Sequence, residues 1–221
     1  MAPRSAQRQS EAEKSRREEA RDQSKEVARI AAFSDGVFAI AITLLALQLE
    51  IPAIGDVDVW AEVYDLRFNF LAFAISFVVI GAYWIAHHRM FSEIERHDGT
   101  LLWLNLLSLF FIVLIPFTTS LVGEHGDQPI SVAIYALSIS GAGFANTGIT
   151  LYALRGHRLC TPVLSDRTIK YHVWRGLTIA LVFLFSLALL PLGPSVVEFS
   201  WLSLIVFQRL VAKRFLTPEA G

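Results

Sequence analysis

The side chains best suited to chemistry in this sequence are Ser34 and Asp35, which lie about one turn inside an apolar run between Arg29 and Glu50. Ionisable side chains within such runs usually serve function or a hydrogen-bond network. Asp35 could relay protons, but it lies close to one end of the run, where water and basic neighbours would keep it ionised. The favoured interpretation is a carboxylate that fixes its helix through hydrogen bonds, with a proton relay as the alternative.

The histidines after the second apolar run form another candidate site. They are His87, His88 and His97, and Trp84 and Arg89 lie beside them. Imidazole binds metals and titrates near neutral pH, so a metal site and a pH sensor are both conceivable. Adjacent histidines on a helix point about 100° apart, and neither a cysteine nor a suitably spaced acid completes a ligand set around this pair. The pattern favours a structural network at the helix end over pH sensing, and pH sensing over metal binding.

Catalytic signatures are absent from the sequence, which contains no nucleophile motif, glycine-rich phosphate loop, zinc-type spacing or nucleotide fingerprint. The chain is therefore expected not to be an enzyme and to hold no cofactor or resident metal. A single Cys160 excludes an intrachain disulfide. The formal net charge of −1 gives no reason to expect a nucleic-acid partner, because the basic residues lie beside apolar runs.

The elements that must position these side chains are membrane-spanning helices. Hydrophobic residues make up 54% of the chain and charged residues 18%, and the charges gather in the loops and at the ends. This pattern predicts an all-α integral membrane protein. A charged tail is expected at 1–28, a six-helix domain at 29–212 and a short tail at 213–221. The expected spans are 30–49, 68–86, 101–122, 130–154, 173–192 and 195–212.

The segments outside these spans are strongly polar. The first tail has no apolar stretch that could act as a secretory signal, and its mixed charges are compatible with either a helix or disorder. The stretch 155–175 is expected to be the longest loop on the inner side. An acidic loop is expected after the first span, with the acidic residues Glu50, Asp56, Asp58, Glu62 and Asp65. Two aromatic residues of this loop, Trp60 and Tyr64, are expected at the membrane interface.

Two spans carry small or helix-breaking residues. Pro116 interrupts the third span, where Thr118 and Thr119 could bind the carbonyl oxygens that a proline frees. In the fourth span a set of small residues falls nearly on one helix face and would permit close packing, and it comprises Gly141, Ala145 and Gly148.

The distribution of positive charge predicts the orientation. All 19 Lys and Arg residues except Arg67 lie on the side that would hold both termini. Positive charge is enriched in cytoplasmic segments, so both termini are expected in the cytoplasm and the protein in the cell membrane.

The first span has two different faces. At about 100° per residue, one narrow stripe carries Gly36, Ile40, Thr43, Leu44 and Leu47, whereas Ser34 and Asp35 point well away from it. Lipid contact alone does not need such a division. The stripe is therefore predicted to line something, and the polar pair to fix the helix against its neighbours.

These residues also resemble a known family. Arg29 followed by Phe33-Ser34-Asp35-Gly36 and VFAIAITLL is similar to the first-helix signature of the transmembrane protein 175 family, the endolysosomal potassium channels and their prokaryotic homologues. YWIAHHRMF after the second span and LNLLSLFFIVLIPFTTSLV in the third extend the resemblance, which covers about 30–212. The chain has no second FSDG motif, so it resembles the single-repeat bacterial form.

The resemblance implies a potassium channel in which the first helix lines a central pore. Ile40, Leu44 and Leu47 would then form the constriction and Thr43 a ring of hydroxyls. Potassium ions, the lipid bilayer and three further copies in a homotetramer are the implied partners. The signature residues Arg29, Phe33, Ser34, Asp35 and Gly36 would brace the helices, and a network at the cytoplasmic end is expected from Trp84, His87, His88 and Asn105.

Apolar rings would select ions in an unusual way. An intact helix has its carbonyl groups committed to its own hydrogen bonds, so isoleucine and leucine rings replace little of an ion's water. Potassium sheds water more easily than sodium and would cross preferentially, and slight narrowing would dewet and close the pore. A proton-permeable channel is the alternative, and a membrane-embedded enzyme or scaffold is the alternative from another class.

Overall fold

The computed structural model describes residues 4–49, 67–160 and 165–216, and these are almost entirely helical. The predicted interface residues between Glu50 and Asp65 lie outside the described residues. Within these residues six helical segments are long and apolar enough to cross a membrane, as expected. The elements are α1 (Arg4–Leu47), α3 (Arg67–Phe91), α4 (Gly99–His125), α5 (Pro129–Leu154), η1 (Arg155–His157), α6 (Asp166–Ser186), η2 (Leu187–Leu192), α7 (Pro194–Ser200) and α8 (Ser203–Leu216).

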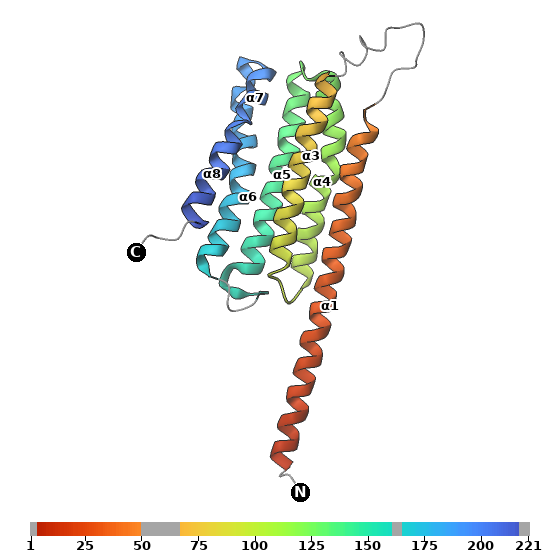
Figure 1. The fold of residues 1–221 in the computed structure, drawn as a ribbon, viewed down its shortest axis with the longest axis vertical. Coiled ribbons are helices and arrows are strands. Elements are labelled where there is room, and N and C mark those ends of the chain that lie inside the picture. The colour runs from red at the N-terminus through yellow and green to blue at the C-terminus, as the bar shows by residue number, and fades with distance from the viewer. Residues whose placement is uncertain (1–3, 50–66, 161–164, 217–221) are drawn as a thin grey trace.

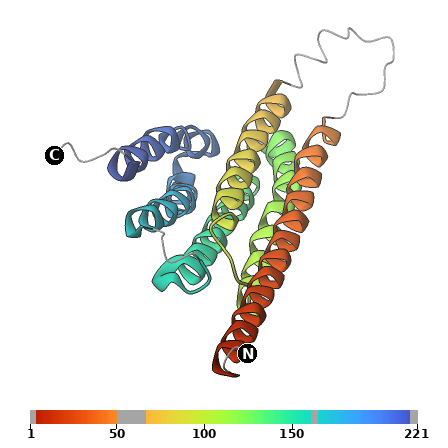
Figure 2. The ribbon, with the colours of Figure 1, turned by 60° about the horizontal axis from the view of Figure 1, so that its bottom comes forward.

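The helices form a bundle with α5 between two groups. Helices α1, α3 and α4 lie on one side of α5, and α6 with α8 lies on the other (Figures 1 and 2). Helix α1 packs along α3 and α4 at the edge of the bundle. It therefore keeps one face turned away from its own chain.

The first helix runs through the predicted boundary at residue 28 without a break and extends beyond the bundle (Figure 1). Its contacts with the bundle begin before that boundary, because Val27 is 5% exposed and the Gln23 side chain accepts a hydrogen bond of 3.3 Å from the backbone N–H of His97. The tail is thus helical from Arg4 onward, and its last turn belongs to the packed domain.

The fifth span begins earlier than predicted. The expectation of a loop up to Arg175 is wrong for its second half, since α6 starts at Asp166. The Ser165 hydroxyl accepts a hydrogen bond of 3.2 Å from the backbone N–H of Thr168 and caps the helix. Hydropathy marks where a helix enters the membrane, whereas the cap marks where it begins, so the apolar run alone placed the start too late.

The sixth span is broken into α7 and α8 at Trp201 and Leu202. The Trp201 ring lies 4.9 Å from the Phe183 ring and 5.2 Å from the Tyr135 ring, centroid to centroid. Its indole N–H donates a hydrogen bond of 2.9 Å to the Ser186 hydroxyl. This anchor holds the break against α5 and α6.

The hydroxyls that follow Pro116 bind a different carbonyl from the one expected. Proline frees the carbonyl of Ile112, four residues earlier. Thr118 and Thr119 donate instead to the Ile115 carbonyl oxygen, over 3.1 and 2.7 Å. The Thr119 hydroxyl also lies 2.8 Å from that of Ser76, so the pair connects α4 to α3.

Glycines bring α5 close to two neighbours. A Cβ built on Gly141 would lie 2.3 Å from the Phe111 ring of α4, which is the close approach that the small-residue face predicts. A Cβ on Gly143 would lie 2.9 Å from the Ala180 Cβ, and one on Gly176 would lie 2.7 Å from the Thr147 hydroxyl. These two contacts bring α5 and α6 together, and the sequence analysis did not identify them.

Asp98 holds the short connection between α3 and α4. Its carboxylate accepts hydrogen bonds from the backbone N–H of Leu101 (2.9 Å) and the Tyr152 hydroxyl (2.6 Å), and Arg158 lies 3.7 Å away. Burial of the carboxyl opposes ionisation, but the hydrogen bonds and the nearby guanidinium prevail and lower the pKa of Asp98. The ionised form therefore stabilises the fold.

We expect Asp98→Ala to lower the free energy of unfolding by about 1 kcal/mol at neutral pH, because it removes the cap of α4. A carboxyl whose pKa is lowered by folding stabilises the protein above its ordinary pKa of about 4, and loses this effect as the pH falls through the folded-state value. The difference from wild type should shrink below about pH 4. Denaturant unfolding in detergent at several pH values measures it, with Thr100→Ala as the control, and a difference that is constant with pH would contradict the assignment.

Candidate functional site

The candidate site is the face of α1 that its own bundle leaves uncovered. The opposite face is buried among α3 and α4 and carries Ser34, Phe38, Ala41 and Leu45. On the uncovered face Ile40 is 61% exposed and Leu47 75% exposed. The same face also carries the exposed residues Gly36, Thr43 and Leu44. The predicted stripe is therefore continuous and solvent-accessible in the single chain.

Thr43 is the polar member of this stripe. Its hydroxyl donates a hydrogen bond of 2.8 Å to the Ile40 carbonyl oxygen of the preceding turn. The hydroxyl hydrogen is thus committed to the helix, and the oxygen keeps its free lone pairs. A cation that passed along the stripe would meet an acceptor at this level and apolar side chains on either side.

A buried network joins three helices behind the stripe. The Ser34 hydroxyl donates to the Ile30 carbonyl (2.9 Å) and accepts from the Asn105 amide (3.0 Å), and the Asn105 oxygen lies 2.8 Å from His87 Nε2. Because the amide oxygen can only accept, His87 carries a hydrogen on Nε2. The His87 ring also stacks on Phe91, with centroids 4.3 Å apart. The network ties α1 to α3 and α4.

A second contact holds α1 at the same level. The Trp84 indole N–H donates a hydrogen bond of 2.8 Å to the Asp35 carboxylate. The Trp84 ring lies 5.7 Å from the His88 ring, centroid to centroid. Asp35, the residue considered as an alternative proton relay, is therefore hydrogen-bonded to α3.

The structure separates the predicted bracing residues into two groups. Ser34 and Asp35 meet Trp84, His87 and Asn105 in these contacts, and His88 joins through Trp84. The other three lie outside them: Arg29 pairs with Glu26 on its own helix at 2.7 Å, Phe33 is 57% exposed, and the Cα of Gly36 faces open space. Within the described residues no group of three or more His, Cys, Asp or Glu side chains could hold a metal ion.

We expect Asn105→Leu to lower the free energy of unfolding by about 2 kcal/mol, because it leaves Ser34 and His87 without their side-chain partner in a buried place. Leu106→Ala changes an exposed residue of the same helix and serves as the control. Denaturant unfolding in detergent measures both variants. Equal stability of Asn105→Leu and wild type would show that the network does not brace α1.

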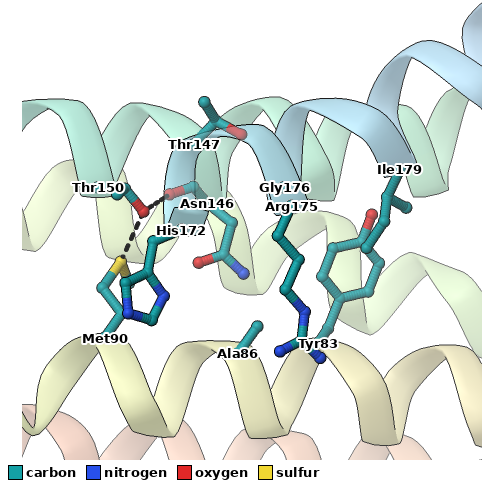
Figure 3. A pocket seen from close by; sticks show the side chains of 10 residues that line it. All are labelled: Tyr83, Ala86, Met90, Asn146, Thr147, Thr150, His172, Arg175, Gly176 and Ile179. Atoms are coloured by element: carbon teal, nitrogen blue, oxygen red, sulfur yellow. Dashed lines mark hydrogen bonds between the residues drawn. The ribbon is translucent and has the colours of Figure 1, made fainter. Parts of the chain in front are cut away.

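A small cavity between α3, α5 and α6 was missed by the sequence analysis. It has a volume of about 20 Å³, and its lining includes Asn146, His172 and Arg175 (Figure 3). Two signals in the sequence mark it: an arginine and an asparagine that lie inside apolar runs. The predicted loop 155–175 and the predicted span 173–192 both include Arg175, and the sequence analysis gives it no role in a site.

Comparison with known proteins connects this geometry to a family. The sequence profile of the family described as endosomal/lysosomal potassium channel TMEM175 matches residues 29–116. A potassium channel of Streptomyces collinus is 35% identical over 142 residues, which cover 62% of this chain and 69% of that protein. The matched stretches span 60% to 69% of the length of the bacterial relatives.

An animal relative and a solved structure extend the similarity. The endosomal/lysosomal proton channel TMEM175 of Rattus norvegicus is 29% identical over 75% of this chain and 35% of its own length. The crystal structure of a lysosomal potassium-selective channel TMEM175 homologue from Chamaesiphon minutus superposes with a TM-score of 0.73 at 27% identity, over 85% of this chain and 98% of that one. These relatives are ion channels and not enzymes. The chain is therefore an integral membrane protein that belongs to the TMEM175 family of ion channels.

Proposed function

We propose that this protein is a potassium channel whose pore is lined by the uncovered face of α1. Support comes from the bacterial relatives that bear the name potassium channel and from the fold shared with a potassium-selective homologue. The observation that carries the proposal is the exposed stripe of Ile40, Thr43, Leu44 and Leu47, which lies opposite the face that packs into the bundle.

One helix cannot enclose a passage, so the proposal requires several copies arranged around a common axis. We propose four copies, each contributing its α1 stripe. The open space beside Gly36 is suited to close approach of a neighbouring copy. The buried contacts of Ser34 and Asp35 would hold each α1 in a fixed rotation, so that the stripe faces the axis.

Selection would follow from the stripe's chemistry. Ile40 and Leu47 lie seven residues apart, so the apolar section is about 10 Å long. In the first turn of this section the carbonyl groups are bonded within the helix, and the Thr43 oxygen is the polar side-chain acceptor of the stripe. Potassium gives up water more easily than sodium, so we propose a modest preference for potassium, and closure when the apolar rings narrow and dewet.

The proposed setting is the cell membrane with both termini in the cytoplasm. The basic residues of the tail, the connection between α3 and α4 and the start of α6 all lie on the side of the bundle that would face the cytoplasm. The positive-inside tendency supports this orientation.

The test is reconstitution of purified protein in planar bilayers with ion-substitution recording. A potassium gradient against sodium should give a reversal potential that shifts toward the potassium equilibrium potential. Equal currents for potassium and sodium would contradict the proposed selectivity. Absence of any ion current from correctly assembled protein would overturn the channel function.

Proton permeation is the second candidate, because the animal relatives are named proton channels. A liposome assay separates the two ions: a pH gradient at constant potassium should produce little flux through a potassium pore. If the reversal potential follows the proton gradient instead, the proton channel becomes the better assignment.

A further inference from the structure

We infer that the cavity between α3, α5 and α6 binds a phosphate group of an anionic lipid from the leaflet next to it. The cavity lies near the end of α3 that carries Met90, level with the first half of α6 (Figure 3). This is the side of the bundle on which the basic residues gather. The assignment does not depend on which ion the channel conducts.

The cavity contains a guanidinium group, that of Arg175, with which no carboxylate of the described residues pairs. Arg175 belongs to the helical segment Asp166–Leu192, which is long and apolar enough to cross a membrane, and lies near the start of its apolar part. Among the described residues its only side-chain hydrogen bond is a long one of 3.4 Å to the Tyr171 hydroxyl. None of the described residues that line the cavity is acidic. A cation at this depth requires an anionic partner or water.

The cavity also contains a buried amide whose nitrogen has no partner among the residues that the structure describes. Asn146 is 6% exposed, its side-chain nitrogen donates no hydrogen bond within the described structure, and the amide points into the cavity (Figure 3). A buried donor that is left unpaired costs about 1–3 kcal/mol, so a partner is expected. The missing partner must be an acceptor.

The hydroxyl hydrogens of the lining are bonded elsewhere and do not compete for an acceptor, and none of these hydroxyls is hydrogen-bonded to the Asn146 side-chain nitrogen in the described structure. The Thr150 hydroxyl donates to Met90 Sδ or the Asn146 carbonyl, at 3.1 and 3.0 Å, and the Tyr83 hydroxyl donates to the Ile139 carbonyl at 2.8 Å. The free donors are therefore the Asn146 amide, the Arg175 guanidinium and the imidazole of His172. Such a set is complementary to an anionic oxygen.

The size of the cavity limits what can enter. About 20 Å³ holds one water molecule or one oxygen atom of a larger group. A phosphate could insert a single oxygen between Asn146 and Arg175 while the rest of the lipid headgroup remains at the opening. Basic pockets between membrane helices on the cytoplasmic side bind anionic headgroups in this way. A headgroup also arrives already concentrated at the membrane surface, which favours a lipid over free phosphate.

The experiment is native mass spectrometry of the purified, delipidated protein titrated with phosphatidylglycerol, with phosphatidylcholine of the same chain length, or with inorganic phosphate. Wild type should bind phosphatidylglycerol about ten times more tightly than phosphatidylcholine, as expected for a charge-assisted contact in a partly buried place. Arg175→Gln should abolish that preference, and Arg175→Lys should retain part of it. Lys170→Gln, which removes an exposed charge from the same helix, should leave it intact.

Three outcomes would overturn the inference. Equal preference in wild type and Arg175→Gln would show that the anionic lipid binds elsewhere. Displacement of the lipid by millimolar inorganic phosphate would assign the cavity to the free anion. No preference in wild type would leave the cavity with a bound water only. Asn146→Leu provides a check in case Arg175→Gln does not fold: it removes the unpaired donor without changing charge and should weaken phosphatidylglycerol binding alone.

Discussion

Replacing Ile40 with asparagine is expected to raise the conductance severalfold and to lower the ratio of potassium to sodium permeability about threefold. In the proposed pore Ile40 narrows the passage with apolar carbon and offers nothing to an ion that has lost water. An amide at this position wets the constriction and coordinates both ions, so the barrier falls for sodium more than for potassium. A threefold loss of discrimination corresponds to only about 0.6 kcal/mol, which one amide per copy can readily supply.

Bilayer recording under mixed-ion conditions measures both quantities. Leu44→Asn, one turn further along the stripe, should have the same kind of effect. Val78→Asn places the same amide on an exposed apolar position of α3 and should leave conductance and selectivity as in wild type. Unchanged selectivity in both α1 variants would count against the stripe as the filter, even if current persists.

The stripe could be predicted from the sequence because packing against the bundle and the helical period both act on this helix. The face that packs into the bundle carries Phe38, Ala41 and Leu45, and the helical period then fixes which residues must point the other way. The side chain of Ser34 could likewise be assigned to the packed face. The identity of its partner could not, because Asn105 is separated from it by 71 positions and only the tertiary structure brings the two together.

Features that depend on capping or on contact between distant helices were harder to predict. The start of α6 is set by the Ser165 cap. This local signal lies outside the apolar run 173–192, so hydropathy alone does not indicate it. Arg175 falls in both the predicted loop 155–175 and the predicted span 173–192, and the structure assigns it to the helix. The Asn146 amide that shares its cavity lies on another helix, so its missing partner is visible only in the assembled bundle.

The second large effect is expected at the contact between α5 and α6. We expect Gly143→Val to lower the free energy of unfolding by about 3 kcal/mol and to abolish ion current, because the helices must separate to admit the side chain. The first added carbon would already lie 2.9 Å from the Ala180 Cβ and 3.1 Å from the Ala180 backbone nitrogen. A change of rotamer cannot relieve a clash with backbone.

Gly148→Val is the matched control on the same helix, since the nearest atom to its added Cβ is 3.8 Å away, at the end of the Leu104 side chain. It should stay within about 1 kcal/mol of wild type and conduct ions. At Gly143, by contrast, the added Cβ would also lie 3.0 Å from the Tyr83 hydroxyl, which donates a hydrogen bond to the Ile139 carbonyl. Denaturant unfolding and bilayer recording on both variants decide the matter: if Gly143→Val is as stable and conductive as Gly148→Val, α5 and α6 can move apart freely, and the cavity beside them cannot hold a ligand in a fixed geometry.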